Sequence, residues 1–242
     1  MDKLTRRNLL QRTAIAGTTV LFSPWFSGKA AIAQTNSLQP ESSDAQGFSY
    51  FTAPEIAFLN AAVSRLVPAD SLGLGAREAG GVFFIDQQMA SPYGRAERWY
   101  MQGPWKEGTK EQGYQLKLTP AQLYRVGIRA VDDYCRSKYS SKTFARLQVA
   151  DQDNLLHALD KGNIKLSAAP VKDFFDMLLQ NTVEGFLADP MYGGNRNFAG
   201  WKLIGFPGPR YNYVNEIERY GKPYMQPTVG LTGRTGTIER KG

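Results

Sequence analysis

The chain has 242 residues, with 29 Lys and Arg, 22 Asp and Glu, one cysteine and one histidine. Five basic residues and one acidic residue lie in positions 1–33, so positions 34–242 hold 24 basic and 21 acidic residues, a net charge of +3 that does not favour a nucleic-acid partner. The lone Cys135 and lone His157 exclude an internal disulfide, a thiolate zinc site, an iron–sulfur cluster and c-type haem attachment.

The first 33 residues have the pattern of a twin-arginine export signal. Arg6 and Arg7 stand next to each other and are followed by Leu9 and Leu10, and a short apolar run then covers residues 14–22. Residues 31–33 supply a small-x-small site, which predicts cleavage between Ala33 and Gln34. A membrane anchor would need roughly 20 apolar residues, more than this run has, although an uncleaved signal acting as a tether stays open. We therefore expect a periplasmic protein exported in the folded state.

The next elements are a polar linker over residues 34–50 and two helices. Thr52 and Glu55 form a capping box for a helix that ends before Pro68, and apolar residues recur at helical spacing between them. A second helix is predicted over residues 76–89, with Gly80-Gly81 inside it. Residues 91–118 then form a long connection rich in tyrosine and tryptophan, and loops of this length are uncommon and usually functional.

Three further helices are predicted in the middle of the chain. The first begins at Thr119-Pro120 with a second capping box, the next covers residues 151–160, and the clearest begins after Ser167 and ends at Asp189-Pro190. The fold class is therefore mainly α, a single helical domain of about five helices over residues 51–189 with long aromatic, Gly/Pro-rich loops.

Residues 190–242 differ in composition from the helical domain. They contain ten glycines, five prolines and eight aromatic residues. Disordered segments are poor in aromatic residues, so we interpret this part as an extended C-terminal arm that packs on the domain and on a partner.

The candidate catalytic groups are few. Glu78 and Asp86 lie eight positions apart on the second predicted helix and could share a face as an acid/base pair, although structural roles for carboxylates are commoner. Gly193-Gly194-Asn195 follows a helix, so it indicates a glycine turn with Asn195 in a left-handed conformation, not a phosphate loop. We expect a buried role for Cys135 and a partly buried structural role for His157, and the sequence predicts no catalytic, cofactor or metal site.

Several short stretches in a fixed order resemble one family. They are Leu66-Val67-Pro68-Ala69-Asp70, Gly75 to Gly80 leading to Phe84-Ile85-Asp86, Leu118-Thr119-Pro120 with Tyr124-Arg125, and Thr182 to Asn195 with Trp201-Lys202. Together they resemble the gluconate 2-dehydrogenase subunit 3 family over about residues 50–210. The most specific part is the run Glu184-Gly185-Phe186 followed by Asp189-Pro190-Met191-Tyr192-Gly193-Gly194-Asn195.

The resemblance implies the non-catalytic small subunit of a heterotrimeric, membrane-bound periplasmic dehydrogenase for gluconate, fructose or a related polyol or sugar acid. FAD would belong to the large subunit and haem c to a multihaem cytochrome c subunit, and this chain would reach the outer face of the inner membrane only through the complex. A chaperone-like escort role follows if its export signal also serves the flavin subunit. The alternative is a stand-alone periplasmic enzyme or ligand-binding protein using Glu78 and Asp86.

The partner interface is expected among aromatic residues outside the helical stripes, in a continuous apolar surface around Trp105 and Trp201. The alternative is that these rings complete the chain's own core. The candidates are Trp99, Tyr100, Trp105, Tyr192, Trp201, Phe206, Tyr211 and Tyr213.

Overall fold

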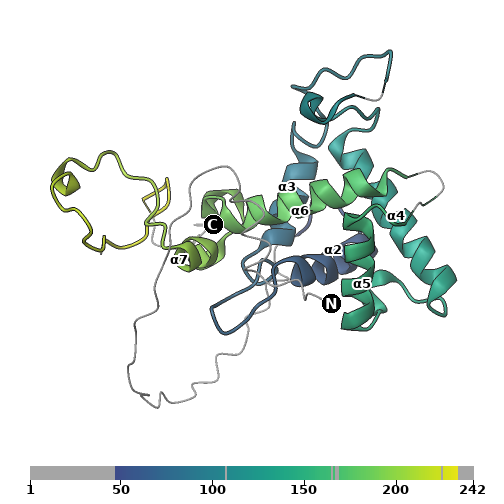
Figure 1. Ribbon diagram of the computed structural model, residues 1–242, viewed down its shortest axis with the longest axis horizontal. Coiled ribbons are helices and arrows are strands. Elements are labelled where there is room, and N and C mark those ends of the chain that lie inside the picture. The colour runs from purple at the N-terminus through teal and green to yellow at the C-terminus, as the bar shows by residue number, and fades with distance from the viewer. Residues whose placement is uncertain (1–46, 107, 165, 167–168, 225, 234–242) are drawn as a thin grey trace.

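The computed structural model describes residues 47–106, 108–164, 166, 169–224 and 226–233. The predicted export signal and residues 34–46 of the predicted linker lie outside these ranges. The described part contains six α-helices and no strand, which confirms the mainly α fold (Figure 1). The helices are α2 (Ala53–Leu66), α3 (Gly81–Ala90), α4 (Pro120–Lys138), α5 (Val149–Asp160), α6 (Val171–Leu187) and α7 (Ala199–Ile204).

Both predicted capping boxes are present. The Thr52 backbone N–H and hydroxyl donate to the Glu55 carboxylate, each at 2.8 Å, at the start of α2. At the start of α4 the Thr119 N–H donates to the Gln122 side chain at 2.9 Å and the Thr119 hydroxyl accepts from the Gln122 N–H at 3.3 Å. These contacts satisfy backbone groups that a helix start otherwise leaves without partners.

Helix α6 is the centre of the domain and packs against α2, α3, α4, α5 and α7. Phe174 on α6 is fully buried, with its ring centroid 6.1 Å from Phe58 and 5.6 Å from Tyr124. A Cβ at Gly127 would collide with the Phe174 ring, so the glycine lets α4 approach α6 closely. The predicted apolar stripes of the helices therefore meet in one core.

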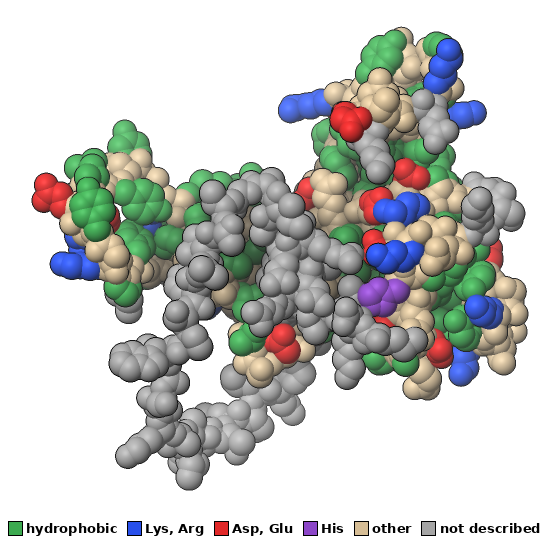
Figure 2. All heavy atoms as spheres, in the orientation of Figure 1, with side chains coloured by type: hydrophobic (Ala, Val, Ile, Leu, Met, Phe, Trp, Pro, Cys, Tyr) green, Lys and Arg blue, Asp and Glu red, His purple; other side chains and the backbone are tan. Residues whose placement is uncertain are grey.

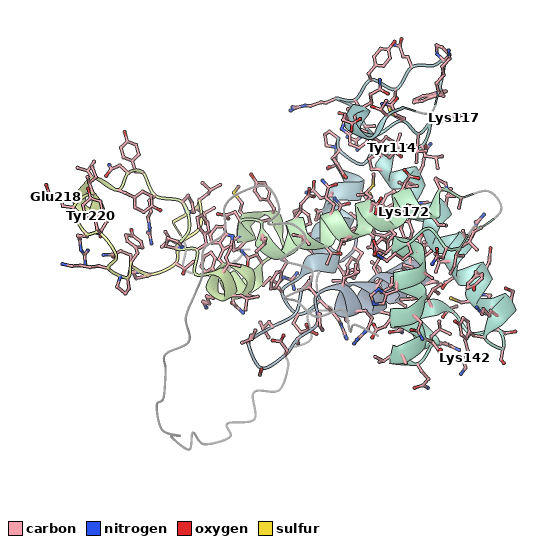
Figure 3. All side chains as sticks on the ribbon, in the orientation of Figure 1. Tyr114, Lys117, Lys142, Lys172, Glu218 and Tyr220 are labelled. Carbon is pink, nitrogen blue, oxygen red and sulfur yellow. The ribbon has the colours of Figure 1, made fainter. Side chains whose placement is uncertain are left out.

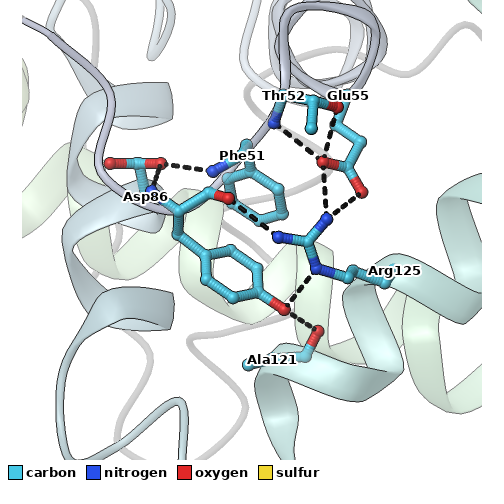
Figure 4. A network of polar contacts seen from close by, with 7 residues as sticks. Phe51, Thr52, Glu55, Asp86, Ala121 and Arg125 are labelled. Atoms are coloured by element: carbon cyan, nitrogen blue, oxygen red, sulfur yellow. Dashed lines mark hydrogen bonds and ion pairs between the residues drawn. The ribbon is translucent and has the colours of Figure 1, made fainter.

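A network of polar contacts fixes the chain where it enters α2 (Figure 4). The fully buried Asp86 carboxylate accepts backbone N–H groups of Ser49, Tyr50 and Phe51 at 2.7 to 3.0 Å. The Arg125 guanidinium donates to the Tyr50 hydroxyl and carbonyl at 2.9 Å and pairs with Glu55 at 3.2 Å. Residues 49 and 50, predicted as linker, are therefore part of the domain.

Two element predictions are corrected. Helix α3 begins at Gly81, because residues 76–80 form a turn that ends with Gly80 in a left-handed conformation of φ 83°. Within this turn, the Ala76 N–H donates to the Val67 carbonyl at 2.9 Å. Helix α7 lies inside the segment predicted to be extended. No helix among the described residues is both long enough and apolar enough to cross a bilayer.

Candidate partner-binding surface

The turn after α6 positions the C-terminal part of the chain. A Cβ at Gly194 would collide with the Gly185 carbonyl oxygen, and a Cβ at Gly200 would collide with the Phe186 carbonyl oxygen. Asn195 is fully buried in the predicted left-handed conformation, with φ 46°. Its side chain donates to the Ala188 carbonyl and accepts the Gly200 N–H, both at 2.8 Å. The run that carries the resemblance is therefore a packing element joining α6 to α7.

Asp189 connects the two ends of the C-terminal region. Its carboxylate accepts the N–H of Met191 at 3.0 Å and the N–H of Leu231 at 2.7 Å, although these residues are 40 positions apart. A Cβ at Gly230 would lie 3.1 Å from both carboxylate oxygens, so the returning backbone passes directly over Asp189. The contacts close residues 190–231 into a loop whose two ends lie against the body.

A second set of contacts closes the base of the projecting part, residues 208–229, which we call the arm loop. The Val229 N–H donates to the Pro207 carbonyl at 3.3 Å, and the Arg210 guanidinium donates to the carbonyls of Pro207 and Pro227. Arg210 also lies over the Tyr224 ring at 5.6 Å. Beyond this base the arm loop extends away from the helical body, beside α7 in Figure 1.

The arm loop exposes a group of large apolar side chains. Tyr220 is 83% exposed and Ile217 is 62% exposed, and Tyr211 and Val214 lie nearby along the loop. Hydrophobic side chains accordingly cover much of this projection in Figure 2, and Figure 3 labels Tyr220 and Glu218 at its far end. More exposed apolar residues flank the base, at Met191, Tyr192, Ile204, Phe206 and Leu231. Isolated apolar residues on a surface are normal, but a cluster of this kind indicates a binding surface.

The structure separates the aromatic candidates of this region into two groups. Tyr211 is fully exposed, Tyr192 and Tyr213 are about half-exposed, and Phe206 is partly exposed. Trp201 is only 5% exposed, and its indole N–H donates to the Leu187 carbonyl at 2.6 Å. It stacks on Phe198 at 5.3 Å, so the prediction of an exposed Trp201 is wrong and this ring completes the chain's own core.

The remaining candidates lie on a different projection, residues 99–118, which we call the aromatic loop. Trp99 is half-buried between Tyr93 and Tyr114, Trp105 is half-buried, and Tyr100 is 81% exposed. Figure 1 shows the aromatic loop and the arm loop leaving the body in different directions. The prediction of one continuous apolar surface around Trp105 and Trp201 is therefore wrong, because the fold places the two residues on separate parts.

Sequence reasoning missed Val214, Ile217 and Tyr220 as exposed residues of the arm loop. Their signal in the sequence is a position in a Gly/Pro-rich segment without helical spacing, whereas the predicted interface residues end at Tyr213. Only the tertiary structure distinguishes these exposed side chains from Trp201, which lies in the same segment.

The predicted acid/base pair does not form. Glu78 is exposed in the turn before α3, whereas Asp86 is buried within α3 with three backbone donors on its carboxylate. The two residues therefore do not share a helix face.

A broad concavity of about 1440 Å³ runs along α4, and neither Glu78 nor Asp86 lines it. Its lining includes the ion pairs of Arg125 with Glu55 and of Arg136 with Asp133, so these charges already have partners.

Cys135 and His157 occupy the positions predicted for structural residues. Cys135 is fully buried, and burial raises the pKa of its thiol to about 12. His157 is half-buried in the last turn of α5. Among the described residues, no three His, Cys, Asp or Glu side chains come together as a possible metal site.

Comparison with family models matches residues 53–208 to gluconate 2-dehydrogenase subunit 3. The matched range covers the body from α2 through α7 and ends at the base of the arm loop. Neither the curated proteins nor the solved structures gave a significant match.

Proposed function

Because the chain belongs to the gluconate 2-dehydrogenase subunit 3 family, we propose that it is the non-catalytic small subunit of a periplasmic dehydrogenase and docks on the flavin-containing large subunit. The family description implies a multi-subunit gluconate dehydrogenase. Gluconate, fructose or a related sugar acid or polyol would be oxidised on the large subunit, which would hold FAD. A multihaem cytochrome c subunit would then accept the electrons. The observation that carries the proposal is the apolar arm loop held on an ordered base.

The arm loop has the properties expected of a protein-binding element. Its exposed side chains are tyrosine, isoleucine and valine, and Tyr is enriched at interface hot spots. Its Arg219 pairs with Glu216 at 2.8 Å, so part of its charge is already neutralised before a partner binds. The contacts at Asp189 and Pro207 hold its ends, so the arm loop loses less conformational entropy when it binds a partner.

The export signal supports an escort role for the same subunit. A flavin subunit that acquires its cofactor in the cytoplasm must cross the membrane folded, and twin-arginine export accepts folded cargo. If the large subunit lacks its own signal, Arg6 and Arg7 of this chain serve both proteins. Docking through the arm loop would then precede export, and the subunit would stay bound at the outer face of the inner membrane.

The docking step is tested by co-purification of the complex. Ile217→Ser and Tyr220→Ser should each weaken binding of the large subunit about 30-fold, the effect of losing a hot spot of about 2 kcal/mol. The matched control is Val149→Ser, since Val149 is 54% exposed at the start of α5, remote from the arm loop in Figure 1. If the arm variants assemble as well as the control, the arm loop is not the docking surface.

The escort step is tested separately with Arg6→Lys and Arg7→Lys combined. This variant should retain both this chain and the flavin subunit in the cytoplasm, measured by fractionation and by periplasmic dehydrogenase activity. Export of the flavin subunit at the wild-type level in this variant would exclude the escort role without affecting the docking proposal.

The alternative of a stand-alone enzyme finds less support. It depended on Glu78 and Asp86, but the Asp86 carboxylate is engaged by the N–H groups of Ser49, Tyr50 and Phe51. A general base needs a free position within reach of a substrate, and this buried carboxylate offers none.

A further inference from the structure

The aromatic loop is a second projection with an ordered base. Trp99 packs between Tyr93 at 5.6 Å and Tyr114 at 5.1 Å, and the Tyr114 hydroxyl donates to the Leu118 carbonyl at 2.6 Å. Figure 3 shows Tyr114 turned into the base of this projection and Lys117 on its flank. The loop is therefore presented in a fixed position on the body.

A short helical turn orders the middle of the loop. The Thr109 N–H donates to the Gln112 side chain at 2.7 Å, in a capping box for the turn Lys110–Gln112. The Trp105 indole packs over Gly103, where a Cβ would lie 3.3 Å from the ring. Local contacts thus also define the conformation farther from the body.

The exposed groups of the aromatic loop differ from those of the arm loop. Tyr100 is 81% exposed and Trp105 is half-buried. The basic Lys106 and Lys117 and the acidic Glu111 are exposed on the loop, and the basic Arg98 is exposed directly before it. Among the described residues none of these three cations has an ion-pair partner, whereas Arg219 on the arm loop pairs with Glu216. Basic and hydrophobic side chains lie at this end of the molecule in Figure 2, together with acidic ones.

We propose that the aromatic loop binds the anionic headgroup surface of a lipid bilayer. Tyrosine and tryptophan favour the membrane interface, where an apolar ring and a polar edge are both accommodated. Lysine and arginine are attracted to anionic lipid, while lysine is depleted at protein–protein interfaces. The combination of Tyr100 and Trp105 with the exposed Arg98, Lys106 and Lys117, which outnumber the exposed Glu111, fits a lipid surface better than a protein partner.

The contact is independent of docking through the arm loop, because the two loops leave the body in different directions (Figure 1). It would revise the expectation that the chain reaches the membrane only through its partners. Each exposed basic residue near an anionic surface contributes about fivefold to the partition coefficient. A loop of this size therefore orients a complex that is already at the membrane and does not anchor it alone.

A site-specific label tests this contact. Cys135 is buried with a raised thiol pKa, so a cysteine introduced on the surface is labelled selectively with an environment-sensitive fluorophore. Gln102→Cys places the label on the aromatic loop and leaves Tyr100 and Trp105 intact. Asn215→Cys is the matched control, an exposed polar residue on the arm loop. Both proteins retain the same N-terminal segment, so any vesicle binding through that segment is common to both.

Vesicles of phosphatidylglycerol and phosphatidylcholine at 3:7 should shift the emission of the label at position 102 to shorter wavelength and leave position 215 unchanged. The protein labelled at position 102 should bind pure phosphatidylcholine vesicles at least tenfold more weakly than the mixed vesicles. Adding Lys106→Glu and Lys117→Glu to the Gln102→Cys protein should lower the partition coefficient at least 25-fold, and thermal melting should show an intact fold.

Three results would overturn the proposal. One is an unchanged signal at position 102 with anionic vesicles, and another is an equal response to neutral vesicles. The third is burial of the label at position 102 by the purified large subunit without lipid, which would make the aromatic loop a protein interface.

Discussion

Asp86 in α3 and Asp189 after α6 perform the same physical task in two parts of the fold. Each is a carboxylate in a buried position that accepts backbone N–H groups from a segment distant in sequence. Asp86 accepts three, from residues 49–51, and Asp189 accepts one from Leu231 and one from its neighbour Met191. Hydrogen bonds to a charged acceptor are stronger than those between neutral groups.

The difference lies in what each carboxylate holds. The segment at Asp86 continues directly into α2, where Phe51 is buried against Tyr124 and Arg125 adds further bonds. The segment at Asp189 closes the arm loop, whose large side chains remain exposed. A carboxylate–backbone contact therefore stabilises the core in one region and positions a binding surface in the other.

The largest effect on stability is expected for Asp86→Ala. It leaves three N–H groups without their charged acceptor, so the free energy of unfolding should fall by about 3 kcal/mol in urea titration. Asp86→Asn keeps one acceptor oxygen, so its free energy of unfolding should lie between those of the wild-type protein and Asp86→Ala. If Asp86→Ala lowers the free energy of unfolding by less than about 0.5 kcal/mol, the contact does not hold the core.

Gly194→Ala should have the next largest effect. The added methyl group would collide with the Gly185 carbonyl oxygen, so the turn that carries Asp189 would have to move away from α6 at a cost of about 2 kcal/mol. Gly47→Ala is the control, since a Cβ at Gly47 meets nothing within 4 Å. Equal melting temperatures for the two variants would contradict the close approach of the turn to α6.

Asp189→Ala should reduce the free energy of unfolding by only about 1 kcal/mol, because the acceptor serves mainly the exposed arm loop. Trypsin should cleave the released loop several-fold faster after Arg210 and Arg219, and mass spectrometry would measure this cleavage. The exposed Asp133→Ala is the control. An unchanged cleavage rate would show that Asp189 does not hold the arm loop.

The smallest effect is expected for Tyr220→Ala. Its side chain is 83% exposed, so the free energy of unfolding should change by less than about 0.5 kcal/mol. The comparison is Tyr124→Phe, which removes the buried hydrogen bond to Asn181 at 3.0 Å and should cost about 1 kcal/mol. If Tyr220→Ala destabilises the isolated chain as much as Tyr124→Phe does, the arm loop belongs to the core.

Local sequence predicted the helical part of the fold well. The capping boxes at Thr52 and Thr119, the stop before Pro68 and the left-handed Asn195 each depend on neighbours within a few residues. Interactions of this range are encoded directly in sequence, because the partners are fixed by chain geometry.

The candidate surface required the tertiary structure. Trp201 and Tyr220 both lie in the Gly/Pro-rich segment and looked alike as aromatic residues, yet one is buried against Phe198 and the other is exposed. Glu78 and Asp86 looked like a pair, but the turn at Gly80 separates them and residues 49–51 occupy Asp86. The sequence by itself thus determined the starts of α2 and α4 and the end of α2, but neither the start of α3 nor the presence of α7. Only the packing of distant segments decided which side chains remain available to a partner, because burial depends on contacts that sequence spacing does not specify.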